Sequence, residues 1–353
     1  MLIEELKQLS ETGETVSDES FIGMDLSGLD LSAMIFEHVD FSHCVFSGAN
    51  LCEATFNKCF FNQVQIQSSN LNKAVFNQCQ MHDATVSQSD LTLSIWADSP
   101  LNGSALLDND LMHASFKGCD LSKCRVVAAK SDHSVFMQCT LEEINFSDNA
   151  FSQTTFFKVD LSRGVFENSS FEKVIFMECD CQRLDFSNRQ VLMCQFIDCQ
   201  MQEIRFRGAD ITQSSFKGCE LALADFTGVA GAYVLFPEAD VSGARFANAR
   251  LGSSLWVDCT ARETDYSGAW LEQAVFHRAQ LSKALFRESV LGYADFSYAC
   301  LMGADFHGAS FSRTQFHRAV MDGQAVKQQP GAIESDSELF KAELWTAGFS
   351  QTV

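Results

Sequence analysis

Proline is nearly absent from this sequence, with three residues among 353, and no stretch is rich in glycine, serine or proline. Linkers between domains are usually built from such stretches. No apolar run approaches the roughly 20 residues of a membrane-spanning helix. The opening residues, MLIEE, also lack the basic and apolar segments of a secretory signal. We therefore expect one continuous architecture, no membrane insertion and a cytoplasmic location, with signal-less export as an effector left open.

Basic residues are also scarce: 25 Lys and Arg stand against 46 Asp and Glu, for a formal net charge of −21. Proteins that bind nucleic-acid phosphates carry a surplus of Lys and Arg. The charge therefore argues against direct nucleic-acid binding, and equally against anionic membranes. It is also graded, because residues 1–60 carry 11 acids and two bases whereas residues 241–300 carry six of each. Such acidity is compatible with simple solubility or with a basic protein partner.

Tryptophan and tyrosine are rare, with four residues each, whereas phenylalanine occurs 32 times. The excess follows a period of five: from Phe21 to Met321 the chain has 61 such central positions, and their phase never slips. Four of them lack a sizeable apolar residue, namely Ser131, Cys181, Gly231 and Ala261. Two residues before each central position lies another selected one, where 45 of 60 residues are small. This period suits neither a helix nor an alternating strand. It suits a short extended segment with two inward residues, followed by a corner.

The repeat is clear in segments such as Gly48-Ala49-Asn50-Leu51, Gly208-Ala209-Asp210-Ile211 and Tyr293-Ala294-Asp295-Phe296-Ser297. They resemble the pentapeptide-repeat family, whose motif is roughly A-(D/N)-(L/F)-x-x, and the resemblance covers about 300 of the 353 residues. It implies an all-β solenoid, a right-handed quadrilateral parallel β-helix with four pentapeptides per coil. The 61 central positions then make about 15 coils.

The two kinds of wall are distinguished by their central residues. Positions ending in 6 hold 22 Phe among 30, whereas those ending in 1 hold 15 Leu and six Phe among 31. Phe is therefore expected on two opposite walls and Leu mostly on the other two, so that large and small residues interdigitate in the core.

The ends of a solenoid need covers, because its last coils leave apolar side chains and backbone groups open. Leu2, Ile3, Leu6 and Leu9 have helical spacing and predict a capping helix within residues 1–20. The β-helix is expected over 21–321, a linker over 322–334, and a second capping helix and tail over 335–353. This second helix starts with the capping-box pair Ser335 and Glu338. Its apolar side, expected either to cover the last coil or to pair two chains, comprises Leu339, Phe340, Leu344 and Trp345.

Fourteen cysteines would ordinarily suggest disulfides or a metal site. Eleven of them occupy the small inward position and Cys181 a central one, which leaves Cys52 and Cys300. Buried free cysteine behaves as a small hydrophobe, so we expect core filler in a reducing compartment and no metal. The eight histidines fall at outward positions, where solvated side chains are expected. No phosphate-binding loop, dinucleotide fingerprint, nucleophile elbow or zinc-protease motif appears. The sequence therefore predicts no enzyme, no catalytic residues and no cofactor.

Aspartate and one irregular wall have structural interpretations. Of 25 Asp residues, 15 directly precede a central residue, where the side chain can bond nearby backbone at the corner. One wall contains most of the residues that depart from the repeat pattern: Ser131, Gly231, Asn109, Asn149 and Arg189. We expect this wall to be bulged, with Arg189 reaching solvent, through either relaxed packing or a functional cause.

A candidate interaction patch lies near the C-terminal end. There His, Arg and Tyr recur one or two residues after central Phe residues, and Arg, Tyr and Trp are common at binding hot spots. The patch comprises Trp270, His277, Arg278, Arg287, Tyr293, Tyr298, His317 and Arg318.

The function expected from these features is that of a non-catalytic protein-interaction scaffold or adaptor. The short N-terminal helix leading into Gly23-Met24-Asp25-Leu26 is similar to pentapeptide-repeat proteins associated with bacterial type VI secretion. The alternative is an acidic DNA mimic that inhibits or protects DNA gyrase, since members of that branch resemble the duplex in shape and charge. That branch also implies a homodimer through the C-terminal end.

Overall fold

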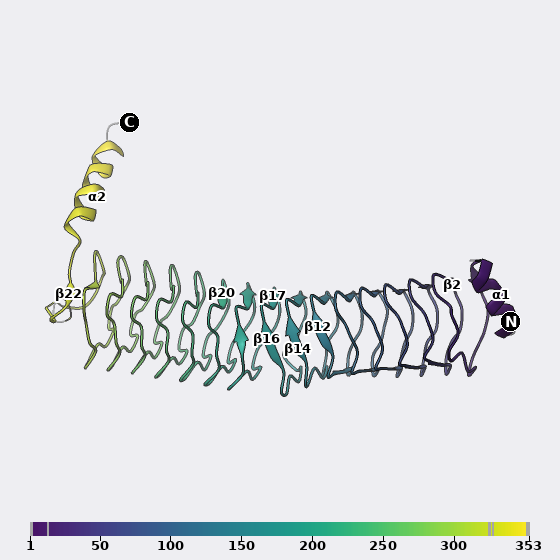
Figure 1. Ribbon diagram of the computed structural model, residues 1–353. Helices are drawn as coiled ribbons and strands as arrows, with labels where there is room; N and C mark the ends of the chain where they lie inside the picture. The colour runs from purple at the N-terminus through teal and green to yellow at the C-terminus, as the bar shows by residue number, and fades with distance from the viewer. Residues whose placement is uncertain (1–2, 13, 324–325, 327, 351–353) are drawn as a thin grey trace. The chain divides into compact units, whose positions relative to one another are not determined.

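The computed structural model describes residues 3–12, 14–323, 326 and 328–350. It confirms a parallel β-solenoid of about 16 turns with a short helix at each terminus. The chain divides into two compact units, Met1–Leu184 (unit 1) and Asp185–Val353 (unit 2). Figure 1 shows stacked turns of backbone in each unit.

Each turn of the solenoid takes 20 residues, so residues 20 apart lie beside each other in parallel register, as Phe36 does with Phe56 and Asp225 with Arg245. The corner follows two residues after the central position, and nearly all the corners have a left-handed backbone, with φ of 54° at His38. A non-glycine residue in this region costs about 1 kcal/mol or more. The neighbouring turn offsets that cost, because the His38 N–H donates to the Asn57 carbonyl at 3.0 Å.

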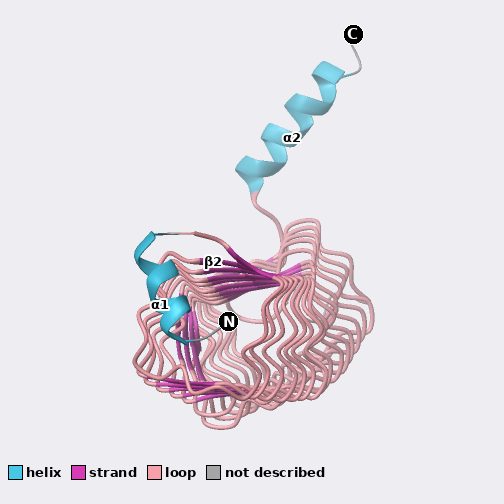
Figure 2. Ribbon diagram, turned by 90° about the vertical axis from the view of Figure 1, so that its right-hand side faces the viewer, coloured by secondary structure: helices cyan, strands magenta, loops and turns pink. Residues whose placement is uncertain are grey.

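In unit 1 a helix, α1 (Ile3–Thr12), precedes seventeen short strands. One wall stacks β1, β2, β4, β6, β8, β10, β13, β15 and β17; a second stacks β3, β5, β7, β9 and β11; and a third includes β12, β14 and β16. Figure 2 shows the strands along the walls and loops at the corners. The strand bounds are β1 Val16–Ser17, β2 Ile35–Glu37, β3 Val45–Ser47, β4 Thr55–Asn57, β5 Gln65–Gln67, β6 Val75–Asn77, β7 Thr85–Ser87, β8 Ile95–Ala97, β9 Ala105–Leu107, β10 Ser115–Lys117, β11 Arg125–Val127, β12 Lys130–Asp132, β13 Val135–Met137, β14 Ala150–Ser152, β15 Thr155–Phe157, β16 Ser170–Glu172 and β17 Ile175–Met177.

The predicted N-terminal helix is present as α1. Leu6 is fully buried, and Ile3 and Leu9 are half-buried; Leu2 lies outside the described residues. Neither helix among the described residues is long and apolar enough to cross a membrane.

Unit 2 contains β18 (Val191–Leu192), β19 (Gln195–Ile197), β20 (Ser215–Lys217), β21 (Thr314–Gln315), β22 (Ala332–Ile333) and α2 (Ser337–Ser350). Between β20 and β21 the turns are joined by single bridges, again 20 residues apart.

The stretch predicted as a linker, 322–334, contributes a strand. β22 pairs in parallel with β21 and so adds a final rung to one wall, with Thr314 beside Ala332. Gly331 makes the approach possible, because its φ is +87° and a Cβ there would clash with the Phe311 carbonyl.

The second predicted helix is present as α2, but its ends differ from those expected. The N-cap is Asp336 rather than Ser335: its Oδ1 accepts the backbone N–H groups of Glu338 and Leu339, both at 3.0 Å. The helix ends at Ser350. Its predicted apolar side does not cover the last coil, because four side chains are between 40% and 70% exposed: Leu339, Phe340, Leu344 and Trp345.

Central residues fill the core as aromatic stacks. In unit 2, Phe276 stacks on Phe296 with ring centroids 4.8 Å apart, and meets Phe286 edge-to-face at 5.8 Å. Such pairs contribute about 0.5–1.5 kcal/mol beyond the area they bury. The repeat of these contacts confirms the predicted Phe-lined walls.

The irregular wall is not bulged at Ser131. Ser131 lies within β12 and pairs in register with Phe151 of β14. At Gly231 the missing side chain is replaced by Ile211 and Leu251, which approach to 3.0 and 3.1 Å from an ideal Cβ. Arg189 is half-buried and keeps its backbone in the ladder, its carbonyl accepting the Asp210 N–H at 2.9 Å.

Tyr266 breaks the pattern of satisfied polar groups. Its ring stacks between Phe246 and Phe286, at 5.3 and 5.0 Å, and its hydroxyl is buried with no hydrogen-bond partner among the described residues. Burial raises the pKa of this phenol well above its usual value.

We therefore expect Tyr266→Phe to raise the free energy of unfolding, by about 1 kcal/mol, because it removes an unsatisfied buried hydroxyl. Thermal unfolding followed by circular dichroism measures this. The matched control is Thr264→Val, which removes a hydroxyl that donates to the Val241 carbonyl at 2.9 Å and should cost about 1–3 kcal/mol. A lower melting temperature for Tyr266→Phe would contradict the assignment.

Candidate functional site

Five of the eight predicted patch residues come together in unit 2. They occupy one wall and its corner on successive turns, and we call them the C-terminal patch: His277, Arg278, Tyr298, His317 and Arg318. The Tyr298 N–H donates to the His317 carbonyl at 2.9 Å, and the Tyr298 ring lies edge-to-face with the rings of His277 and His317.

Two members of the C-terminal patch are paired within the solenoid. The Arg278 guanidinium donates two hydrogen bonds of 2.7 Å to Asp258, one turn earlier. These bonds hold the pKa of the Asp258 carboxyl below its usual range. His277 Nε2 lies 2.6 Å from Asp295 Oδ2.

The other three converge on a carboxylate from outside the coils. Glu343 of α2 accepts hydrogen bonds from the Tyr298 hydroxyl and Arg318 Nε, and lies 3.2 Å from His317 Nε2. The Arg318 guanidinium also lies over the Phe340 ring, 5.2 Å from its centroid. The expectation of solvated histidines is therefore wrong for His317, which is 1% exposed.

The remaining predicted residues lie apart from this group. Arg287 lies half a turn after His277 along the chain, and its Nε donates to Asp305 Oδ2 at 2.6 Å. Trp270 is 51% exposed and stacks above Arg250, not beside the C-terminal patch. Tyr293 lies at another corner with Arg313 over its ring.

Three residues of interest escaped the sequence interpretation. Tyr233 is 59% exposed at the same corner as Tyr293, three turns earlier. The two residues are separated by a multiple of 20, and this spacing could have predicted the shared corner. Glu343 and Asp336 had no such signal, because their positions depend on the path taken between the solenoid and α2.

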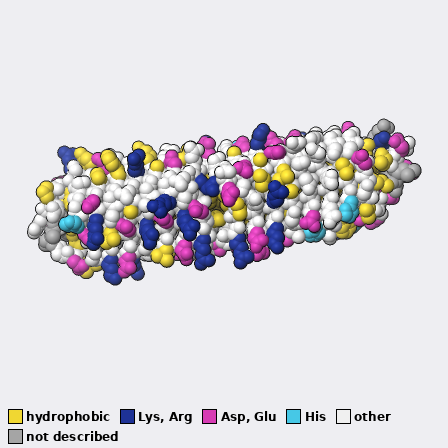
Figure 3. Space-filling model, turned by 90° about the horizontal axis from the view of Figure 1, so that it is seen from below, with side chains coloured by type: hydrophobic (Ala, Val, Ile, Leu, Met, Phe, Trp, Pro, Cys, Tyr) yellow, Lys and Arg dark blue, Asp and Glu magenta, His cyan; other side chains and the backbone are white. Residues whose placement is uncertain are grey.

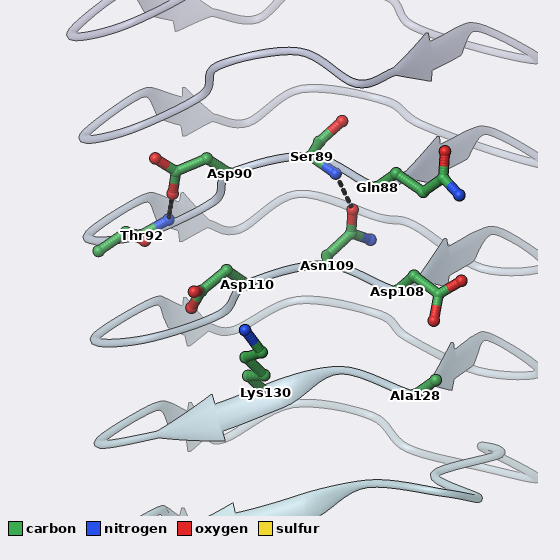
Figure 4. A pocket seen from close by; sticks show the side chains of 9 residues that line it. All are labelled: Gln88, Ser89, Asp90, Thr92, Asp108, Asn109, Asp110, Ala128 and Lys130. Atoms are coloured by element: carbon green, nitrogen blue, oxygen red, sulfur yellow. Dashed lines mark hydrogen bonds between the residues drawn. The ribbon is translucent and has the colours of Figure 1, made fainter.

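Among the polar grooves of unit 1, two are lined by polar side chains that already have partners. The first, of about 520 Å³, includes Asp90 and Asn109 (Figure 4). Asp90 Oδ1 accepts the Thr92 N–H at 2.9 Å and Asn109 Oδ1 accepts the Ser89 N–H at 3.0 Å. These oxygens thus serve the backbone. The second groove, of about 640 Å³, includes Arg163 and Glu142, which form a 2.9 Å ion pair with each other.

Histidines one turn apart offer the nearest approach to a ligand set. The rings of His113 and His133 are 4.7 Å apart, and Asp132 Oδ1 lies 3.1 Å from His133 Nδ1. Nevertheless, within the described part of the chain no group of three or more His, Cys, Asp or Glu side chains is arranged to hold a metal ion.

A family profile described as pentapeptide repeats matches the chain in eight copies. The matched segments are 25–63, 35–72, 59–95, 194–229, 269–308 and 290–323. The chain belongs to the pentapeptide-repeat family.

Solved structures of other pentapeptide-repeat proteins are similar at low identity. HetL from the cyanobacterium Nostoc sp. strain PCC 7120, involved in heterocyst differentiation regulation, is 15% identical; the match covers 89% of this chain and 96% of HetL, with a TM-score of 0.26. QnrB1, a plasmid-mediated fluoroquinolone resistance protein, is 14% identical over 76% of this chain and 94% of its own, with a TM-score of 0.27. No curated protein sequence matches. Likenesses at this level say nothing about what this pentapeptide-repeat protein binds.

Charge differs between the two units of this pentapeptide-repeat protein. Unit 1 has 26 acidic and 11 basic residues, and unit 2 has 20 and 14. Many of the acids serve corners, as predicted: Oδ1 of Asp25, Asp160 and Asp295 each accepts the N–H two residues on, at 2.8–3.0 Å. Figure 3 shows a face on which Lys and Arg side chains alternate with Asp and Glu. The negative charge is therefore interrupted on that face.

We expect twelve of the fourteen cysteines to resist a bulky thiol reagent in the native protein. Twelve are buried, and Cys52 and Cys300 are half-buried. Burial also raises the pKa of Cys44 to about 11 and of Cys124 and Cys259 to about 12, so little reactive thiolate exists at neutral pH. Mass spectrometry after labelling locates the modified residues, with denatured protein as the control in which all fourteen react. Fast native labelling of Cys119, Cys139 or Cys219 would contradict this.

Proposed function

We propose that this pentapeptide-repeat protein is a non-catalytic interaction scaffold that binds a protein partner through the C-terminal patch. The observation that carries the proposal is the gathering of Arg278, Tyr298, His317 and Arg318 on successive turns of one corner and wall. Because each turn is fixed to the next by backbone hydrogen bonds, these side chains are presented in a constant order and spacing. Arg and Tyr on a rigid support are the usual anchors of protein interfaces.

The interior of the solenoid supports a scaffold more than an enzyme. Catalytic groups work in a concave pocket, whereas the central positions described here are filled by packed side chains. In the first groove, the side-chain oxygens of Asp90 and Asn109 accept backbone N–H groups. The N-terminal resemblance favours an adaptor associated with bacterial type VI secretion as the specific form of this proposal.

A second candidate function is an acidic DNA mimic that inhibits or protects DNA gyrase. The observation in its favour is the charge of unit 1, with 26 acidic against 11 basic residues. The corner-bonding Asp residues and the interspersed cations of Figure 3 weaken it, because a mimic of the duplex needs a continuous array of negative charge.

Capture from a native cell extract tests the proposal, using the full chain as bait. We expect the double variant Tyr298→Ala and Arg318→Gln to lose at least about tenfold of the specific partner, since hot-spot residues contribute 2 kcal/mol or more, on the order of tenfold or greater. Arg287→Gln, at an arginine outside the C-terminal patch, is the matched control and should bind normally. Equal capture by all three proteins would contradict the proposal. Recovery of gyrase subunits through unit 1 would favour the mimic instead, and secretion components would favour the adaptor.

We also propose that two chains pair through α2 as a homodimer. Its exposed Leu339 and Leu344 lie away from the coils, and two-fold pairing is the commonest closed assembly. We expect Leu339→Glu with Leu344→Glu to give a monomer by light scattering, and Lys341→Gln, on the same helix, to leave the dimer intact. A wild-type protein that is monomeric at tens of micromolar would refute the pairing.

A further inference from the structure

The Glu343 site combines three donors from two turns of the solenoid. Tyr298 belongs to one turn, and His317 and Arg318 belong to the next. Their contacts leave the Glu343 side chain 21% exposed and His317 1% exposed. A surface ion pair between two mobile side chains contributes little. A carboxylate held by several donors, one of them charged, in a partly desolvated site binds more strongly.

His317 is fixed in one tautomer by this arrangement. The Asp336 N–H donates to His317 Nδ1 at 3.2 Å. Nδ1 therefore carries no proton, and Nε2 carries it and points at Glu343, 3.2 Å away. The imidazole is thus preset as a donor to a carboxylate.

The aromatic contact gives the site a second element of recognition. Phe340 lies three residues before Glu343, so both side chains share one face of α2. Arg318 binds both, through Nε to the carboxylate and through its guanidinium face to the ring. A cation over an aromatic ring is attracted by the ring's electron-rich face. The site therefore recognises a helix that carries an aromatic residue three positions before an acidic one.

Two turns before Arg318, at the same corner, Arg278 pairs with an acid of the solenoid itself, Asp258, through two bonds. Arg318 instead takes a carboxylate from α2, a helix of 14 residues. Isolated helices of that length are marginal in water, and two apolar side chains of α2, Leu339 and Leu344, remain 40% and 56% exposed. The contact is therefore built mainly from polar bonds that can be exchanged.

We propose that Tyr298, His317 and Arg318 form a carboxylate-binding site for an acidic helix of a partner protein, and that α2 occupies this site in cis. The inference rests on the proposed scaffold function and deepens it: the partner presents an aromatic residue three positions before a Glu or Asp. Such a partner displaces Glu343 and Phe340 and takes over their contacts. A partner helix must therefore compete with α2 for the site, because occupancy by α2 in cis lowers the apparent affinity of the site for the partner.

The test uses full-length protein and a fluorescein-labelled synthetic peptide with the sequence of residues 334–350. Fluorescence anisotropy measures binding to wild type and to Glu343→Gln. We expect Glu343→Gln to bind the peptide about tenfold more tightly or better, since its own α2 no longer competes. Adding Arg318→Gln to that variant should remove the gain. Glu343 lies on α2 and not in the coils, and an unchanged circular dichroism spectrum and melting temperature would show that folding is intact.

A second peptide, identical except for Glu343→Gln, separates the carboxylate site from the apolar side of α2. It keeps Leu339 and Leu344, and we expect it to bind at least about tenfold more weakly. Equal binding of both peptides, equal binding by wild type and Glu343→Gln, or no binding to either would overturn the inference. So would conversion of a wild-type dimer to monomer by the first peptide alone, because α2 would then occupy a second copy. The Tyr298 and Arg318 variants could lose the cellular partner while peptide binding is unaffected by Glu343→Gln and Arg318→Gln. In that case the scaffold function stands and this inference falls.

Discussion

The parallel 20-residue register is the constraint on which the rest of the structure depends. Backbone groups on each turn bond to the turn beside it, as the Asp225 N–H does to the Ile204 carbonyl and the Phe226 N–H to the Arg245 carbonyl. A residue gained or lost would move every later side chain to the wrong face. The register thus requires an apolar residue at one inward position and a small residue at the other. It also requires a corner every five residues. The five-residue period of the sequence reflects both requirements.

The corners connect the fold to the charge of the molecule. An Asp before a central residue accepts a backbone N–H two residues later, as Asp25 does from Ser27. Hydrogen bonds from the Ser27 side chain and from its backbone N–H hold the pKa of Asp25 below its usual value. The carboxylate is then a part of the turn as well as a surface charge. A large negative net charge is therefore an expected by-product of a long solenoid with aspartate at its corners. Charge alone is weak evidence for mimicry of DNA.

Features that repeat could be predicted from the sequence, and features that occur once could not. The period of five predicted the solenoid, the Phe-lined walls and the buried cysteines, because the contacts between neighbouring turns are copies of a few kinds of contact. The burial of His317, the cap at Asp336 and the strand β22 depend on a single path of the chain after Met321. In sequence terms His317 is equivalent to His277, which is half-exposed. The difference between them comes from α2, and local pattern carries no information about it.

The candidate site lies where the repeat stops, and the register explains why. Along the corner of the C-terminal patch the side chains run Asp258, Arg278, Tyr298 and Arg318, and Arg278 finds its acid one turn back. Arg318 has Tyr298 behind it, and the residue 20 positions ahead, Glu338, belongs to α2 rather than to another turn. A cation at the end of the stack thus lacks the neighbour that the repeat supplies elsewhere. In a solenoid whose interior turns pair their backbone groups with one another, the terminal turn is where exposed polar groups remain for a helix to bind, whether that helix is α2 or a partner's.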